Sequence, residues 1–423
     1  MATEVTEPIA LDKTLQRVAS ALEQVAASET GGGVWGFIED MDVKDPEDRI
    51  IYTGDSIGKT PMSLNSDGSV NEGGWADFID QLNNHPWMVK SDGTPDYRLM
   101  DTDYTKKMDG TASDVANTDY DGGAFAWIRR IYKSEKMYGN RRAVSFRFTA
   151  AEGYEPVGFR DPNDNVLEGI WIPMFYGSKD SNGKMRSLSG MQPIYSNATA
   201  QEYTAISAVG TRAAFYGGGI AETLTDILIM LCGSTDVPGV IGTGNCSGYD
   251  DSKSPTNGVL ANACVGSGRW YGTTTGKALN KYFHSIVLGS YQQWQRDPYR
   301  LLINGTYYVS KNYTYDLTGA KYTKTDVTVP AAVSGVYPHY YKTVEGFGAL
   351  PTSNGGYNGS SSTGGCDGFW ANITITAVLR RFANASGGLL CGPRACHASD
   401  DAGLAWWSIG ASLILLPPVG VAA

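Results

Sequence analysis

The acidic pair Asp400-Asp401 near the C-terminus places two side chains of a catalytic type together. Glycoside hydrolysis needs two carboxyl groups that face each other across a cleft. Neighbouring residues of an extended strand point to opposite faces, so these two side chains would diverge. Adjacent acids in a loop of small residues are typical of solvated positions, or of contacts to a cation or a sugar hydroxyl. The sequence therefore predicts no catalytic residues, and we expect that the protein is not an enzyme.

Three side chains that can bind metal or act as nucleophiles, Cys391, Cys396 and His397, follow one another closely. A structural zinc site normally has four ligands at paired short spacings, and only the distant Cys366 is available as a fourth. Adjacency in sequence also rarely gives the hydrogen-bond geometry of a Cys–His nucleophile. We expect no metal site. A disulfide between Cys391 and Cys396 stays open beside the favoured interpretation, buried free thiols.

Glycine-rich loops at residues 242–244 and 266–268 invite comparison with phosphate-binding motifs. Neither lies between a clear strand and a helix, and no Gly-Lys-Ser/Thr follows either of them. Gly58-Lys59-Thr60 does occur, but the upstream Gly54 is at the wrong spacing. We expect these glycines to serve turns, and we expect no cofactor.

Composition disfavours other classes of function. Charged residues make up only 18% of the 423 residues and the net charge is −10, whereas nucleic-acid binding depends on Lys and Arg that neutralise phosphates. The apolar run 224–232 is too short to span a bilayer, so no membrane insertion is expected. Met1 is followed by acidic residues instead of a secretion signal. We therefore expect synthesis in a cytoplasm and release by another route, such as cell lysis inside a virus particle.

The N-terminal residues have the pattern of a self-associating helix. Five apolar residues are spaced 4-3-4-3, the repeat of a coiled-coil seam: Leu11, Leu15, Val18, Leu22 and Val25. The pattern ends at the triglycine 31–33, which has the composition of a linker. An amphipathic helix packed on its own domain is the alternative, and the linker favours a small oligomerising bundle.

Beyond the linker, 52 glycines and many Ser, Thr, Asn and Tyr favour short strands and ordered loops, which predicts an α+β, β-rich fold. We predict strands at residues 34–38, 50–52, 124–132 and 143–149, with further strands and hairpins at 313–322 and 327–330. Helices are predicted at 74–82, 202–214 and 224–232, the last apolar enough to be buried. Residues 352–365 are predicted to form a loop.

The C-terminal segment is rich in Trp, Gly, Cys and small polar residues. It begins Gly365-Cys366-Asp367-Gly368-Phe369-Trp370 and ends Leu404-Ala405-Trp406-Trp407-Ser408-Ile409-Gly410. Together with earlier pieces such as Asp103-Tyr104-Thr105-Lys106-Lys107 and Met174-Phe175-Tyr176-Gly177-Ser178, it resembles phage proteins of the major-tropism-determinant kind. In these proteins a C-terminal C-type-lectin-like domain is diversified by retroelements. The resemblance covers roughly residues 90 to 418.

The resemblance implies an oligomerisation helix with linker at 1–33, a central β-rich attachment domain at 34–140 and a C-type-lectin-like ligand-binding domain with insertions at 141–423. It implies a surface protein of a tailed-phage virion, made in the host bacterial cytoplasm, and a homotrimer as the oligomer. The expected partners are a bacterial cell-surface protein or glycan and other virion proteins.

The resemblance also indicates which residues contact the receptor. Near its end the family often reads Asn-x-Asn-Trp-Asn-Ile-Gly, so Leu404, Trp406 and Ser408 occupy positions expected to be diversified, while Trp407 belongs to the scaffold. Aromatic and small polar side chains suit such contacts. The expected receptor-binding residues are Asn372, Thr374, Arg381, Phe382, Asn384, Arg394, His397, Asp400, Asp401, Leu404, Trp406 and Ser408.

Two other functions stay open. In a capsid head fibre or decoration protein, the lectin-like fold would mainly pack on neighbouring subunits. A glycan depolymerase would remove host polysaccharide on incubation with the pure protein.

Overall fold

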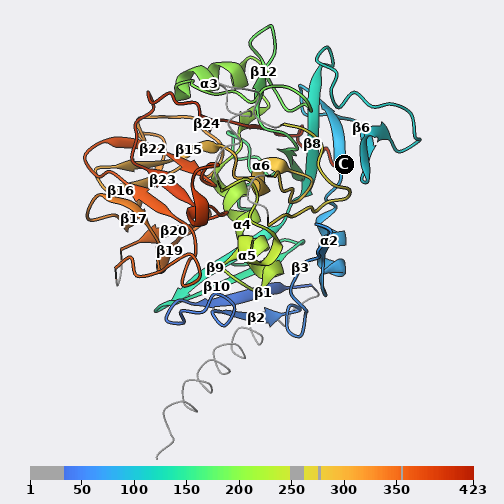
Figure 1. Ribbon diagram of the computed structural model, residues 1–423. Helices are drawn as coiled ribbons and strands as arrows, with labels where there is room; N and C mark the ends of the chain where they lie inside the picture. Colours follow the sequence, from blue (N-terminus) through green and yellow to red (C-terminus); the bar gives the residue numbers. More distant parts are fainter. Residues whose placement is uncertain (1–32, 248–261, 275–277, 354–355) are drawn as a thin grey trace, which may run out of the picture.

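The computed structural model describes residues 33–247, 262–274, 278–353 and 356–423 (Figure 1). Strands make up 34% of the residues and helices 12%, which confirms the predicted β-rich character. The heptad-like segment 11–25 lies outside the described residues, as does the predicted oligomerisation region apart from Gly33.

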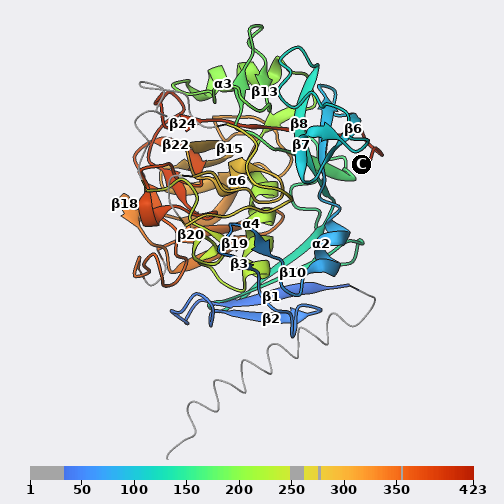
Figure 2. The same ribbon diagram turned by 45° about the vertical axis from the view of Figure 1, so that its right-hand side comes forward.

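A four-stranded antiparallel sheet lies where the described chain begins, at the lower end of the molecule in Figures 1 and 2. Its order is β2 (Ile50–Gly54), β1 (Trp35–Asp40), β10 (Arg141–Arg147) and β9 (Tyr132–Tyr138). The predicted strands at 34–38, 50–52 and 143–149 are therefore present. The division expected at residue 140 falls in the tight turn between β9 and β10, where Gly139 has a φ of +62°. Since β1 pairs with β10, residues on both sides of that division share one sheet.

A seven-stranded sheet joins early and late parts of the chain. Its order is β14 (Ala213–Phe215), β25 (Leu413–Leu415), β11 (Gly169–Pro173), β8 (Gly122–Arg129), β5 (Pro86–Lys90), β6 (Pro95–Met100) and β7 (Asp103–Lys107). The last strand, β25, lies between β14 and β11, so its apolar side chains are buried. The C-terminal tail continues towards α2 (Ala76–Leu82), where Asn83 donates a hydrogen bond to the carbonyl of Ala423 at 3.2 Å.

The third large sheet carries most of the C-terminal segment. Its order is β17 (Thr323–Thr328), β16 (Thr306–Val309), β15 (Trp294–Ile303), β22 (Thr376–Arg381), β23 (Cys396–Ala398), β21 (Phe369–Ala371) and β18 (Val333–Val336), with β24 (Ile409–Gly410) paired to β15. Strands predicted at 313–322 are absent from this described stretch, because Asp316 instead accepts backbone hydrogen bonds from Thr318 and Lys321 in turns. Three two-stranded ribbons complete the strands: β3 (Ser63–Leu64) with β4 (Val70–Asn71), β12 (Ser178–Lys179) with β13 (Met185–Arg186), and β19 (Tyr340–Val344) with β20 (Gly348–Thr352).

Within the described ranges, the helices are short except for one at the centre. They are α2, α3 (Thr199–Ser207), α4 (Gly218–Cys232), α5 (Val237–Ile241), α6 (Ile286–Gly289) and the 3₁₀ turn η2 (Gly388–Leu390). The three predicted helices are confirmed as α2, α3 and α4, with α3 ending earlier than predicted and α4 starting earlier. All 15 residues of α4 are buried, as its apolar sequence indicated.

Helix α4 also brings two carboxylates, Glu222 and Asp226, into the interior, where they meet cations from all parts of the chain. Asp226 binds Arg142 and Lys133 at 2.5 Å each, and Glu222 binds Arg300 at 2.9 Å. Burying such charges costs stability unless each is paired and hydrogen bonded. The network therefore joins α4 to the four-stranded sheet, through Lys133 and Arg142, and to the third sheet, through Arg300.

Candidate functional site

One face of the third sheet gathers aromatic and charged side chains. Register places Trp370 of β21 opposite His397 of β23, and His397 opposite Arg380 of β22. Residues two apart on a strand share a face, which brings Trp294 of β15 to the same side, since its neighbour Arg296 pairs with Arg380. We call Trp294, Trp370, Arg380 and His397, together with Asp400 from the loop after β23, the tryptophan–arginine face.

The side chains of the tryptophan–arginine face are in direct contact. Trp294 and Trp370 meet edge to face, with ring centroids 5.4 Å apart, and Trp370 stacks on His397 at 5.4 Å. Arg380 donates hydrogen bonds to Nδ1 of His397 at 2.6 Å and to the carboxylate of Asp400. The guanidinium group also lies 5.8 Å from the centroid of the Trp294 ring. The rings of Trp294, Trp370 and His397 thus lie beside the ion pair of Arg380 and Asp400.

The charge states of this face follow from burial. Desolvation, followed by the nearby cation of Arg380, lowers the pKa of His397 to about 2, so the imidazole is neutral and accepts at Nδ1. Desolvation also lowers the pKa of Arg380, to about 10, although the Asp400 carboxylate opposes this shift. At neutral pH the face therefore carries a charged arginine, held by a carboxylate, and an uncharged histidine.

The neutral histidine predicts acid sensitivity of the fold. The unfolded chain takes up a proton at His397 below about pH 6.5, whereas the folded protein takes it up only near its lowered pKa of about 2. Stability is thus fully present above about pH 6.5 and is lost as pH falls, by up to about 1.4 kcal/mol per pH unit from this group. Urea unfolding at several pH values gives the free energy of unfolding as a function of pH. This free energy should fall less steeply with decreasing pH in His397→Gln than in the wild-type protein. An unchanged slope would contradict the assignment; the buried His284, whose pKa is also lowered, supplies the residual slope.

The loop that follows the face is anchored by hydrogen bonds to its main-chain carbonyls. The Ser408 carbonyl accepts from the Trp294 N–H at 2.9 Å, and the Trp406 carbonyl accepts from the Ser196 N–H at 3.1 Å. Arg296 donates to the carbonyl of Leu404 and is paired with Glu202 of α3. Because main-chain atoms make these bonds, side chains of the loop can differ without loss of its anchors.

The structure brings several of the predicted receptor-binding residues together. His397 and Asp400 belong to the tryptophan–arginine face, and the anchored loop beside it carries half-buried Leu404 and exposed Asp401. Trp406 is 57% exposed and is the only exposed tryptophan among the described residues. This loop and the tryptophan–arginine face form the candidate site.

Three other predicted residues lie in separate turns. Asn372 is half-buried and Thr374 is exposed between β21 and β22, where the Asn372 side chain accepts hydrogen bonds from Thr374. Asn384 is half-buried and caps the turn at Ser386.

The remaining four predicted residues are buried, which corrects their expected role as contact residues. Phe382 is fully buried and Arg381 is paired inside with Glu222 at 2.5 Å. Arg394 forms a two-pronged ion pair with buried Glu39 at 2.7 and 2.8 Å. Ser408 is 6% exposed because it directly precedes the buried strand β24. Their places in the core leave no surface for a partner.

Trp294, Trp370 and Arg380 are members of the face that are absent from the list of predicted receptor-binding residues. Trp370 is half-buried beside His397. Trp294 is far from the C-terminal segment in sequence, and only the pairing of β15 with β22 places it here. The adjacent arginines 380 and 381 face opposite sides of the sheet, so register alone decides which one belongs to the face.

The structure also describes the other side chains considered for chemistry. All six cysteines are free thiols, so Cys391 and Cys396 form no disulfide with each other. Within the described ranges, no three His, Cys, Asp or Glu side chains are grouped as ligands for a metal ion. Asp400 and Asp401 diverge, as expected, because Asp400 turns to Arg380 while Asp401 accepts from the backbone of Gly403.

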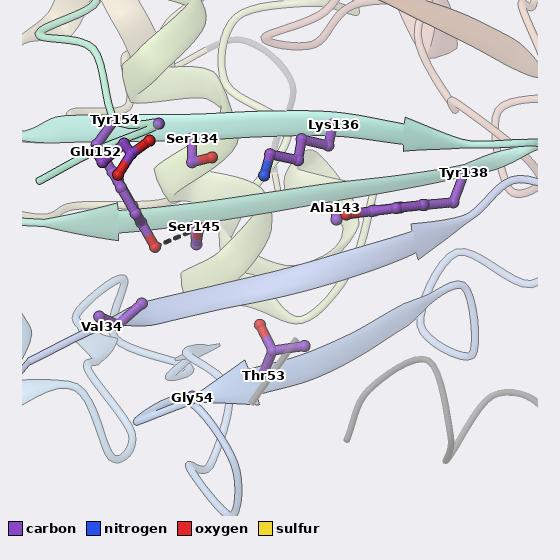
Figure 3. Close-up of a pocket in the computed structure, with 11 residues that line it drawn as sticks. Val34, Thr53, Gly54, Ser134, Lys136, Tyr138, Ala143, Ser145, Glu152 and Tyr154 are labelled. Carbon is purple, nitrogen blue, oxygen red and sulfur yellow. Dashed lines mark hydrogen bonds between the residues drawn. The ribbon is translucent and has the colours of Figure 1, made fainter. Parts of the chain in front are cut away.

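A pocket of about 150 Å³ lies on the outer face of the four-stranded sheet (Figure 3). Small residues such as Ser134, Ala143 and Ser145 leave this hollow, and Tyr154 reaches over it to hydrogen bond with Ser145 at 3.0 Å. Exposed Tyr138 and Lys136 also line it. The pocket belongs to a sheet other than the one with the tryptophan–arginine face, and none of the predicted receptor-binding residues lines it.

Comparison of the chain with protein-family models and with curated proteins finds no match. Among the described residues, no helix is both long and apolar enough to cross a bilayer.

Proposed function

We propose that this protein is a surface protein of a tailed-phage virion that binds a bacterial-surface protein or glycan through the candidate site. The exposed Trp406 carries the proposal. An exposed tryptophan beside the half-buried Trp370, which packs on the buried Trp294, and a polar rim has the composition of a binding hot spot. Binding of this kind requires no catalytic group.

The candidate site lies at the end of the molecule opposite to the start of the described chain, which supports attachment of the protein to the virion through its N-terminal residues. The described chain begins at Gly33 beside the four-stranded sheet, at the lower end in Figures 1 and 2, whereas α3 and β24 lie at the upper end. The loop with Trp406 contacts the segment before α3 through the bonds Ser196 to Trp406 and Thr199 to Ala402. A protein anchored through residues 1–33 would therefore present the candidate site away from its anchor.

We also propose that residues 141–423 contain the C-type-lectin-like domain and that the protein is a trimer. The antiparallel pairing of β11 with β25 brings an early and the last strand of this region together, which suits a domain whose ends meet. Three copies of the candidate site would convert weak single contacts into avidity. Light scattering on the full chain measures the oligomer directly.

The binding test uses the full-length protein, labelled with a fluorophore, on a panel of bacterial strains. We expect saturable binding to some strains, competed by unlabelled protein, and reduced phage adsorption to those strains. Uniform weak binding to all strains, with no effect on adsorption, would favour the capsid decoration alternative. Release of soluble saccharide from the cells would favour the depolymerase.

Sequencing of codons 366 to 416 across a population of this element gives a second prediction. We expect substitutions concentrated at Asp400, Leu404 and Trp406, whose side chains are accessible, and few at the buried Arg381 and Ser408. A nearby template copy and reverse transcriptase gene would accompany them. Equal variation at buried and exposed positions, or an invariant segment without a template, would contradict a diversified face.

A further inference from the structure

Two cysteines that are distant in sequence meet beside the candidate site. Cys246 follows α5, and Cys391 follows the 3₁₀ turn η2; each is 5% exposed. A hydrogen bond joins the Cys246 and Cys391 side chains. Cys396, the partner considered from sequence, is buried on the opposite side of the third sheet from His397.

The backbone holds the two thiols in place independently of the sulfurs. The Gly388 N–H donates to the Cys246 carbonyl at 2.7 Å, which joins the two segments directly. The carbonyl of Asn384 lies 3.3 Å from the Cys391 sulfur and is a second acceptor for its single S–H. A Cβ at Gly387 would lie 2.7 Å from the Cys391 sulfur, so glycine leaves the room that this sulfur occupies. The segments are thus already docked before any covalent bond forms.

We propose that Cys246 and Cys391 are a site of oxidative modification, at which an intramolecular disulfide forms once the protein leaves a reducing cytoplasm. Disulfides persist in oxidising surroundings and are rare in the cytosol. The hydrogen bond between the two side chains brings the sulfurs close together, as a disulfide requires. Loop closure across so long a stretch of chain also gives a large constraint on the unfolded state.

The chemistry balances with a small-molecule disulfide as oxidant. The Cys246 thiolate attacks one sulfur of the reagent, and the first reagent thiolate leaves and takes up a proton. Cys391 then loses its proton and attacks the Cys246 sulfur, which expels the second reagent thiolate. Two protein thiols are oxidised by two electrons, and one reagent disulfide is reduced to two thiols. Cys246 suits the attacking role because the hydrogen bond from Cys391 lowers its pKa to about 7.

The disulfide would fix the turn that carries Asn384 and the 71% exposed Leu389. Its effect on receptor binding, by pre-organisation of this turn, rests on the proposed function. Formation of the bond itself does not, so the test below reads the bond and not binding.

The experiment titrates thiols in denatured full-length protein before and after treatment of the folded protein with hydroxyethyl disulfide. Reduced protein has six thiols, and we expect four after oxidation, that is six minus two, with a peptide map that joins Cys246 to Cys391. In Cys391→Ser, Cys246 has no resolving thiol and stays as the mixed disulfide with the reagent, so the count should fall from five to four with one bound reagent group. The matched variant Cys396→Ser should fall from five to three with no bound reagent. The oxidised protein should also unfold at a higher temperature than the reduced one.

Six remaining thiols in oxidised wild-type protein would overturn the proposal, as would a map that joins other cysteines. The peptide map is made on wild-type protein, so the answer does not depend on whether a variant folds. A confirmed disulfide in a protein that binds no strain would leave this inference standing and reject the proposed function.

Discussion

Glu39→Gln is expected to lower the free energy of unfolding by about 3–5 kcal/mol, the cost of removing one partner from a buried ion pair. Glu39 is fully buried and binds Arg49 at 2.9 Å, Arg142 at 3.2 Å and Arg394 at 2.7 Å. Arg142 keeps Glu135 and Asp226 as partners, but Arg49 and Arg394 lose the carboxylate that they contact. Glutamine has nearly the same shape, so the loss reports charge and not packing.

The measurement is urea unfolding followed by tryptophan fluorescence and by circular dichroism, which together test for a single transition. Glu155→Gln is the matched control, because it removes the same charge from an exposed pair with Arg160. We expect a change below about 1 kcal/mol for this control. Equal effects for the two variants would show that the buried network contributes no more than a surface pair.

The buried ion pairs of Glu39 also predict how the stability of the protein changes in acid. Burial opposes ionisation of Glu39, but the charges of Arg394, Arg49 and Arg142 together hold its pKa well below its usual range. The stabilisation is therefore fully present above the unfolded pKa of about 4.3 and is lost as pH falls through the lower folded value. Glu39→Gln should lack this part of the acid transition, so its stability should approach that of the wild-type protein at low pH.

Trp406→Ala is expected to weaken cell binding by about 30-fold or more, which corresponds to at least about 2 kcal/mol for a hot-spot aromatic. The side chain is 57% exposed and its loop is anchored through backbone atoms, so the variant should fold and unfold like the wild-type protein. Binding to a responsive strain, measured as a function of concentration, gives the ratio of apparent affinities.

Tyr138→Ala is the control for the loss of an exposed aromatic side chain elsewhere. Tyr138 is 55% exposed and lines the pocket of the four-stranded sheet. This sheet is not the one that carries the candidate site. We expect cell binding within about two-fold of the wild-type protein, as for side chains outside a hot spot. A large loss for Tyr138→Ala with none for Trp406→Ala would move the binding site to that pocket.

Local patterns in the sequence were enough for elements that depend on nearby residues. The β-rich character, the strands at 34–38 and 50–52 and the buried helix α4 follow from apolar periodicity and composition, which act within a few residues. Turns were harder to predict: at 313–322, the Asp316 side chain accepts hydrogen bonds from the backbone, and turns replace the predicted strands.

Only the tertiary structure decided which residues share the candidate site. Arg380 and Arg381 are neighbours of the same type, yet the pairing of β22 with β15 and β23 sends one to the tryptophan–arginine face and the other to Glu222. Likewise, the ion pair of Arg394 with Glu39 and the hydrogen bond of Cys391 with Cys246 join residues that are far apart in the sequence. Composition and periodicity indicate which side chains will be buried and will need a partner. Strand register and long-range packing determine which residue that partner is, because those contacts exist only once distant segments are folded together.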